Sequence, residues 1–198
     1  SETDYASAVA LLEECEGLTE SIVMMKTMAA VEAASRLRAT TGVREKRGLF
    51  KSCGHLSGND EIDRAKRQLD AHEALRHETS FPKLKEHFET CDDLSESDLL
   101  DRIRHILHSA SFLLRPESVH VDELREHVAT CAELKDCAEL DDCKRLLHVE
   151  STLETLTTRH ELSSALRIVR GRLSGSEPLK AAEVMLRKAT LACAGTLH

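Results

Sequence analysis

Histidines and cysteines at helical spacing are the residues of this sequence that could do chemistry. His87 and Cys91 stand four residues apart, as do His127 and Cys131, so each pair would share one face of a helix and could supply two zinc ligands. No third or fourth ligand stands nearby in the sequence, and both cysteines occupy positions of apolar stripes. We therefore predict that these cysteines pack in a core and that the chain holds no metal.

A second candidate is the segment HEALRH, residues 72–77, which is similar to a zinc-protease motif. Its two histidines are five residues apart, about 140° around a helix, so they cannot converge on one ion. A glycine-rich phosphate loop is also missing, because no glycine occurs between Gly58 and Gly171. We predict no catalytic residues and no cofactor.

The seven cysteines bear on the compartment of the protein. None has CxxC spacing, and most stand among apolar neighbours in helical patterns. Cys131, Cys137 and Cys143 are six residues apart, which places successive members on opposite sides of a helix. This usage indicates reduced structural cysteines in a cytosolic or nuclear protein. The acidic start, residues 1–14, predicts neither a secretory signal nor a transit peptide.

Composition and charge exclude several classes of function. Hydrophobic residues make up 41% of the chain, and only five of its residues are aromatic, one Tyr and four Phe, so the cores must be aliphatic. No stretch approaches the roughly 18 apolar residues of a membrane span. The net charge of −8 argues against general binding to nucleic acid, because affinity for phosphate comes from dense Lys and Arg.

The chain contains an internal repeat. Residues 43–91 align with residues 121–169 at an offset of 78 without a gap, and 13 of 49 positions are identical, where unrelated sequences would give about three. After one inserted residue the match resumes at an offset of 79, with residues 95–100 on residues 174–179. The identical pairs are Val43/Val121, Glu45/Glu123, Arg47/Arg125, Cys53/Cys131, Leu56/Leu134, Glu61/Glu139, Asp63/Asp141, Lys66/Lys144, Arg67/Arg145, Leu69/Leu147, Leu75/Leu153, Thr79/Thr157 and Leu84/Leu162.

Hydrophobic periodicity within each copy is helical. In the second copy, Leu147 and Leu166 are predicted to lie in the core. We expect helices over residues 121–131, 140–147 and 162–169, a short third helix opened by a capping box of Ser151 and Glu154, and a long fifth helix capped by Ser176.

These elements predict an all-α fold of tandem duplicated five-helix bundles, either right-handed bundles or a short α-solenoid. Residues 41–115 form the first repeat domain and residues 116–198 the second, with Pro116 between them. Two amphipathic segments in residues 1–40 predict an N-terminal helical hairpin. This hairpin is either a truncated third copy or a cap over the first repeat.

Five helices in the order long, medium, short, medium, long resemble the TFIIS N-terminal domain family, which includes domains of the integrase-binding type. The resemblance is best in the second copy, where ESTLETLTTRHELSSALRIVRGRL, residues 150–173, looks like the family's stretch from the end of helix two to the loop after helix four. The first copy matches through the duplication. Its Pro82, near the start of the fourth helix, makes it a poorer match alone.

The resemblance implies a docking module of nuclear transcription-elongation or chromatin assemblies. Such modules bind short disordered segments in which hydrophobic or aromatic anchors stand beside acidic residues. The receiving loops would correspond to residues 134–141 and 170–174, where arginines replace Asp92 and Asp93 of the first copy, so an acidic ligand should prefer the second copy. The implied partner-binding residues are Leu134, Asp136, Cys137, Arg167, Arg170, Arg172 and Leu173.

Alternatives remain open at this point. The arginines could instead complement the dipole of a helix end, and the first loop is polar where an apolar rim would suit an aromatic anchor. A structural α-helical subunit of a permanent complex outside transcription is the second hypothesis, in cytoplasm or nucleus. An enzyme, a metal-dependent module, or nucleic-acid binding through the basic C-terminal face are the others.

Overall fold

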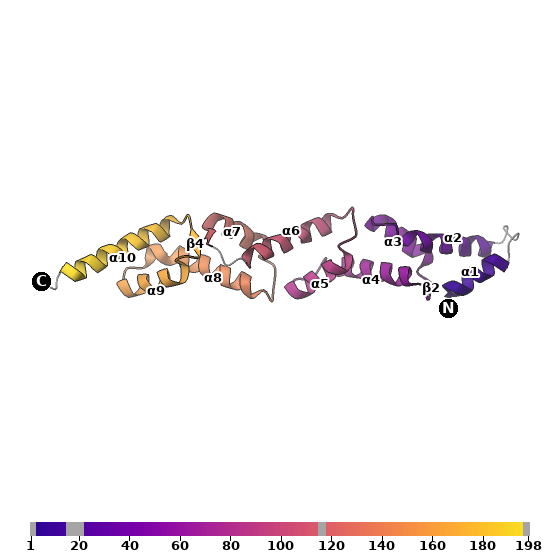
Figure 1. Cartoon of the computed structure of the whole chain (residues 1–198), viewed down its shortest axis with the longest axis horizontal. Coiled ribbons are helices and arrows are strands. Elements are labelled where there is room, and N and C mark those ends of the chain that lie inside the picture. The colour runs from indigo at the N-terminus through magenta and orange to yellow at the C-terminus, as the bar shows by residue number, and fades with distance from the viewer. Residues whose placement is uncertain (1–2, 15–21, 115–117, 196–198) are drawn as a thin grey trace. The chain divides into compact units, whose positions relative to one another are not determined.

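The computed structural model of the chain describes residues 3–14, 22–114 and 118–195, and helices dominate them (Figure 1). The predicted all-α class is therefore confirmed. The chain divides into two compact units, residues 1–104 and residues 105–198. This division falls inside one helix, whereas the repeat alignment suggests a boundary near Pro116, which lies outside the described residues.

Unit 1 begins with the predicted N-terminal hairpin. Its first two helices pack on each other, and the second of them also packs on the next two helices of the unit. The elements are β1 (Thr3–Asp4), α1 (Tyr5–Glu14), α2 (Ile22–Leu37), α3 (Val43–Cys53), β2 (Leu56–Ser57), α4 (Asp60–Ala74), α5 (Phe81–Cys91) and α6 (Asp98–Leu113), which ends in unit 2.

Unit 2 follows the order of helices expected from the second copy. Ser176 caps the last helix as predicted, because its Oγ accepts a hydrogen bond from the backbone N–H of Leu179 at 3.1 Å. The elements are β3 (Val119–His120), α7 (Val121–Thr130), α8 (Ala138–Thr152), the 3-10 helix η1 (Leu153–Thr155), α9 (Arg159–Val169), β4 (Leu173–Ser174) and α10 (Glu177–Gly195).

The predicted capping box of Ser151 and Glu154 is wrong. Ser151 still belongs to the last turn of α8, and its hydroxyl donates to the carbonyl of His148 at 2.8 Å. The capping box of this region instead opens α9, where Thr158 and Glu161 exchange side-chain and backbone hydrogen bonds.

Four loops of the structure share one conformation. They read LSGN (56–59), LSES (94–97), LKDC (134–137) and LSGS (173–176), and each directly precedes a helix. The first residue of each is a buried leucine. The third residue of each has a positive φ: 71° at Gly58, 57° at Glu96, 55° at Asp136 and 74° at Gly175. The left-handed residue turns the chain from one helix into the next.

The spacing of these loops reveals a shorter repeat. Their leucines, Leu56, Leu94, Leu134 and Leu173, follow one another after 38, 40 and 39 residues. The 78-residue unit is therefore two helical hairpins in succession. In sequence, CEGLTES (15–21) matches CDDLSES (91–97), so we interpret the N-terminal hairpin as a further repeat of the same kind.

Short parallel strand pairs connect successive hairpins within each unit. β1 pairs with β2 in unit 1, β3 pairs with β4 in unit 2, and a single bridge joins Gly42 to Ser95. Each pair links the residues before the first helix of one hairpin to the residues before the second helix of the next hairpin. These strands were not predicted, because two residues are too few to show an alternating pattern.

The cores are aliphatic, as the composition predicts. In unit 1, alanines of α2 let this helix approach α3 and α4 closely, around Leu37, Cys53 and Ile62. In unit 2, Leu140 and Val169 are fully buried. The core position predicted for Leu166 is confirmed, since it is 4% exposed, whereas Leu147 is only half-buried.

Candidate functional site

Three of the predicted partner-binding residues belong to the core of unit 2. Leu134 is 8% exposed, and Cys137 and Leu173 are each 4% exposed. Their side chains pack inward, so a ligand could not reach them in the folded state. Asp136 lies exposed at the positive-φ position of its loop.

Arg172 is held by an ion pair within unit 2. Its Nη2 lies 2.6 Å from Oδ2 of Asp142, at the start of α8. In unit 1 the equivalent pair has the opposite polarity, with Nη2 of Arg64 2.8 Å from Oδ2 of Asp93. The arginine and the aspartate have exchanged positions between the copies. At these positions the difference in loop charge therefore reflects two arrangements of one ion pair, which joins the loop to α8 in unit 2 and to α4 in unit 1.

Arg167 and Arg170 instead line a groove between α9 and α10, which run side by side (Figure 1). The groove encloses about 160 Å³, and three of its side chains are arginines against one carboxylate. We call it the basic groove. It is lined by Ser163, Leu166, Arg167, Arg170, Glu183, Leu186 and Arg187.

Among the described residues, the arginines of the basic groove form few ion pairs. Arg170 Nε lies 3.4 Å from Glu183 Oε1, and the arginine side chain remains 72% exposed. Within the described residues no ion pair engages Arg167 or Arg187. An exposed pair such as Arg170–Glu183 contributes little to stability. The groove can therefore receive an anionic group, and the apolar Leu186 is part of its lining.

A groove of similar size in unit 1 has the opposite character. It encloses about 190 Å³ between α4 and α5, and it presents three carboxylates beside two arginines. One arginine is already paired with one of these carboxylates. An acidic ligand would meet repulsion there. Its lining residues are Arg64, Arg67, Gln68, Glu89, Thr90, Asp92 and Asp93.

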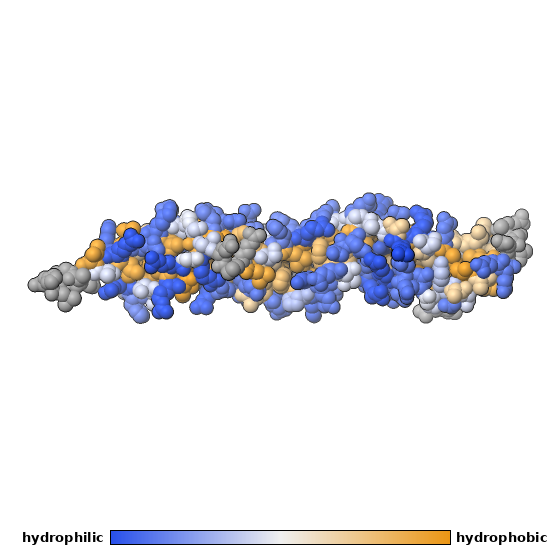
Figure 2. Space-filling model, viewed as in Figure 1, coloured by the Kyte–Doolittle hydropathy of each residue, from blue (hydrophilic) through white to orange (hydrophobic). Residues whose placement is uncertain are grey.

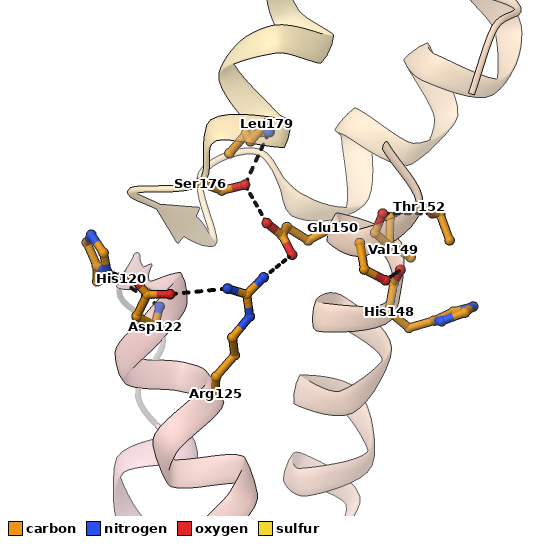
Figure 3. A network of polar contacts seen from close by, with 10 residues as sticks. His120, Asp122, Arg125, His148, Val149, Glu150, Thr152, Ser176 and Leu179 are labelled. Carbon is orange, nitrogen blue, oxygen red and sulfur yellow. Dashed lines mark hydrogen bonds and ion pairs between the residues drawn. The ribbon is translucent and has the colours of Figure 1, made fainter. Parts of the chain in front are cut away.

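A buried carboxylate joins three elements of unit 2 (Figure 3). Glu150 on α8 is 1% exposed. Its Oε1 accepts a hydrogen bond from Ser176 Oγ at 2.6 Å, and its Oε2 lies 2.8 Å from Nη2 of Arg125 on α7. Because every carboxylate oxygen is engaged inside the fold, this cluster is structural and offers no free acid or base.

The equivalent position of unit 1 holds His72 in place of Glu150. His72 is 3% exposed, and its Nε2 lies 2.8 Å from Ser97 Oγ. Its Nδ1 is buried and has no hydrogen-bond partner among the described residues. Burial, assisted by the neighbouring Arg47 and Arg76, lowers the pKa of His72. The histidine is therefore neutral in the folded protein at neutral pH.

This lowered pKa predicts a pH dependence of stability. Below its ordinary pKa of 6.5, His72 takes up a proton in the unfolded chain but not in the native one, so acidification favours unfolding. We expect the free energy of unfolding, measured by urea denaturation, to fall between about pH 7.5 and about pH 5. The fall should be smaller in His72→Gln, which cannot titrate. Equal falls in both proteins would show that His72 does not cause it.

The described cysteines are poor nucleophiles. Burial raises the pKa of Cys91 and of Cys131 to about 11, and it also raises the pKa of Cys53, Cys137 and Cys143. These thiols are therefore protonated at neutral pH. In the part of the chain that the structure describes, no three His, Cys, Asp or Glu side chains gather as a metal site would require. None of its helices is long and apolar enough to cross a membrane.

Of the seven residues that line the basic groove, the sequence predicted only Arg167 and Arg170 as partner-binding and missed the other five, among them Leu186 and Arg187. The sequence does indicate a basic region, because it has seven Lys or Arg and only three acidic residues from Arg159 onward. That excess identifies the region but not the groove, because α9 and α10 pack through contacts that a linear sequence does not specify.

No protein-family model, no curated protein and no solved structure matches the chain.

Proposed function

We propose that the protein is a non-catalytic scaffold for protein–protein interaction, whose basic groove docks short disordered segments that combine acidic residues with a hydrophobic anchor. The observation that carries this proposal is the pair Arg167 and Arg187. Both are arginines without an ion-pair partner in the described residues, and both line one groove with the apolar Leu186.

The chemistry of the basic groove favours this class of ligand. Guanidinium groups bind carboxylates through paired, charge-assisted hydrogen bonds. Their position on one groove also steers an acidic segment toward it against the overall charge of −8. An apolar side chain of the ligand would cover Leu186, which is half-buried in the free protein.

The biological setting rests on the family resemblance alone. The proposals that the ligands belong to transcription or chromatin factors, and that the protein is nuclear, therefore stay predictions. The basic groove needs only the ligand chemistry described above, which occurs in disordered segments of many proteins.

A second candidate function is a structural subunit of a permanent complex. The observation that favours it is a set of large apolar side chains exposed on α1, α2 and α10, among them Val23 and Leu191. Exposed apolar faces of this kind mark surfaces that another chain covers.

Charge reversal in the basic groove tests the docking proposal. We expect Arg167→Glu/Arg187→Glu to weaken binding of an acidic, aromatic-containing peptide at least 10-fold in a fluorescence-polarisation titration, because two attractive contacts become repulsive. The matched control is Lys144→Glu/Arg145→Glu, which makes the same change of charge on exposed positions of α8 outside the groove. This control should bind as the parent does.

Arg172→Glu provides an internal comparison. Because Arg172 is paired with Asp142 outside the groove lining, this substitution should affect peptide binding much less than the groove reversal. Equal losses in the groove variant and in the α8 control would show that only net charge matters, and the docking site would be refuted.

A further inference from the structure

Two faces of the chain expose apolar side chains in clusters (Figure 2). The α1–α2 face consists of Leu11, Ile22, Met25 and Met28. The α10 face consists of Val184, Met185 and Leu191. Each exposes large side chains at positions where a water-facing helix would carry polar ones.

The helix α6 shows what normally covers the α10 face. At the offset of 79, Phe112 of α6 corresponds to Leu191 of α10. Phe112 is only 8% exposed, and its ring stacks on His127 of α7 with the centroids 4.0 Å apart. Leu191, by contrast, is 72% exposed. Within unit 2, α6 is thus covered by the first helix of the following hairpin, while the same face of α10 is open.

Ile106 of α6 and Met185 of α10, six residues earlier in each helix, allow the same comparison. The backbone carbonyl of Ile106 accepts a hydrogen bond from Cys131 Sγ at 3.7 Å, so α7 lies directly against this part of α6. Met185 at the equivalent position of α10 is 47% exposed. A helix like α7 could therefore pack on the α10 face as α7 packs on α6.

The helix α1 is such a helix. Through the repeat, Cys15 corresponds to Cys131, which places Leu11 of α1 where His127 stands in α7. Leu11 is 55% exposed. A leucine on α1 would thus meet a leucine on α10, as His127 meets Phe112.

The start of α2 is also more apolar than the equivalent part of another repeat. Its exposed Ile22, Met25 and Met28 are apolar. The equivalent residues of α4 are all charged: Asp60, Asp63 and Lys66. The repeat itself therefore does not require apolar residues at these three positions.

The charges of the two regions are complementary. Residues 1–25 contain six acidic residues and no Lys or Arg, a net −6, whereas residues 159–198 contain seven Lys or Arg and three acids, a net +4. Opposite charge around two apolar faces favours their association and disfavours each face binding itself.

We propose that copies of this chain associate head to tail, with the α10 face of one copy packed against the α1–α2 face of a second copy. The contact reproduces between copies the α6–α7 packing found within the chain. Because the two faces differ, each added copy leaves one of each open, and the assembly grows as a chain. No residue of the two apolar faces lines the basic groove, although the arginines of the groove contribute to the positive charge of this region.

Sedimentation equilibrium of the full chain tests the proposal. The average mass should rise from the 22.0 kDa of the monomer to at least twice that value as the concentration increases from about 1 to about 300 µM. Leu191→Glu and Leu11→Glu should each abolish this rise, because these two residues take the places of Phe112 and His127 in the contact. Leu114→Glu, at an exposed leucine outside both faces, should leave it intact.

Mixing the two inactive variants distinguishes this geometry from a symmetric dimer. Leu191→Glu retains the α1–α2 face and Leu11→Glu retains the α10 face, so an equimolar mixture should form a dimer of twice the monomer mass and stop there. A parent chain that remains monomeric over the whole range overturns the proposal. A Leu11→Glu variant that dimerises by itself also overturns it, because that variant would then associate without the α1 side of the contact.

Discussion

Replacing Arg125 by alanine should lower the free energy of unfolding by about 3 kcal/mol, because it leaves the carboxylate of Glu150 buried without a cation. Glu150 is 1% exposed, and its Oε2 has Arg125 as its partner at 2.8 Å (Figure 3). The arginine side chain is half exposed, so the low end of the range for broken buried pairs applies. Urea denaturation followed by circular dichroism at 222 nm measures the loss.

A double-mutant cycle separates the missing cation from lost packing. Glu150→Gln keeps an oxygen to accept from Ser176 but removes the charge, so Arg125→Ala/Glu150→Gln should regain much of the stability lost by Arg125→Ala alone. The exposed Arg145→Ala serves as the control and should change stability by less than about 0.5 kcal/mol. If Arg125→Ala matches this control, the carboxylate does not depend on its arginine.

Truncating Leu140 to alanine should cost about 2–5 kcal/mol, since the removed methyl groups leave a cavity that the neighbouring helices fill only partly. Leu140 is fully buried at the start of α8. Thermal denaturation and urea denaturation both report the change.

Leu147 on the same helix supplies the comparison. It is half-buried, so Leu147→Ala removes less buried surface and should cost clearly less than Leu140→Ala. Equal losses at the two positions would contradict the burial that the structure assigns to them.

Part of the candidate site was predictable from residue types. The excess of basic residues after residue 158 identified the region, and Arg167 and Arg170 do line the basic groove. Leu134, Cys137 and Leu173 were predicted to meet a partner, but they fill the core. In loops this short, the apolar side chains pack into the core and fix the loop. Their hydrophobicity in the sequence therefore does not show whether they face the core or a partner.

The sequence by itself determined the features that depend on neighbours along the chain. Period and capping residues specify the helices, and Ser176 shows this at the start of α10. The duplication is likewise visible at fixed offsets. The hairpin period of 38–40 residues, by contrast, depends on the structure. Glu96 and Asp136 adopt the left-handed conformation that Gly58 and Gly175 adopt in the other two loops, and their residue types alone do not indicate this.

Only the tertiary structure decided which charges are free. Arg172 and Asp142 are 30 residues apart in the chain, yet their side-chain atoms lie 2.6 Å apart. The pair removes an arginine that sequence reasoning had assigned to ligand binding. Arg187, ten residues into α10, joins the groove instead. The physical reason is that a side chain's availability depends on its neighbours in space, and helix packing brings together residues that no local pattern relates.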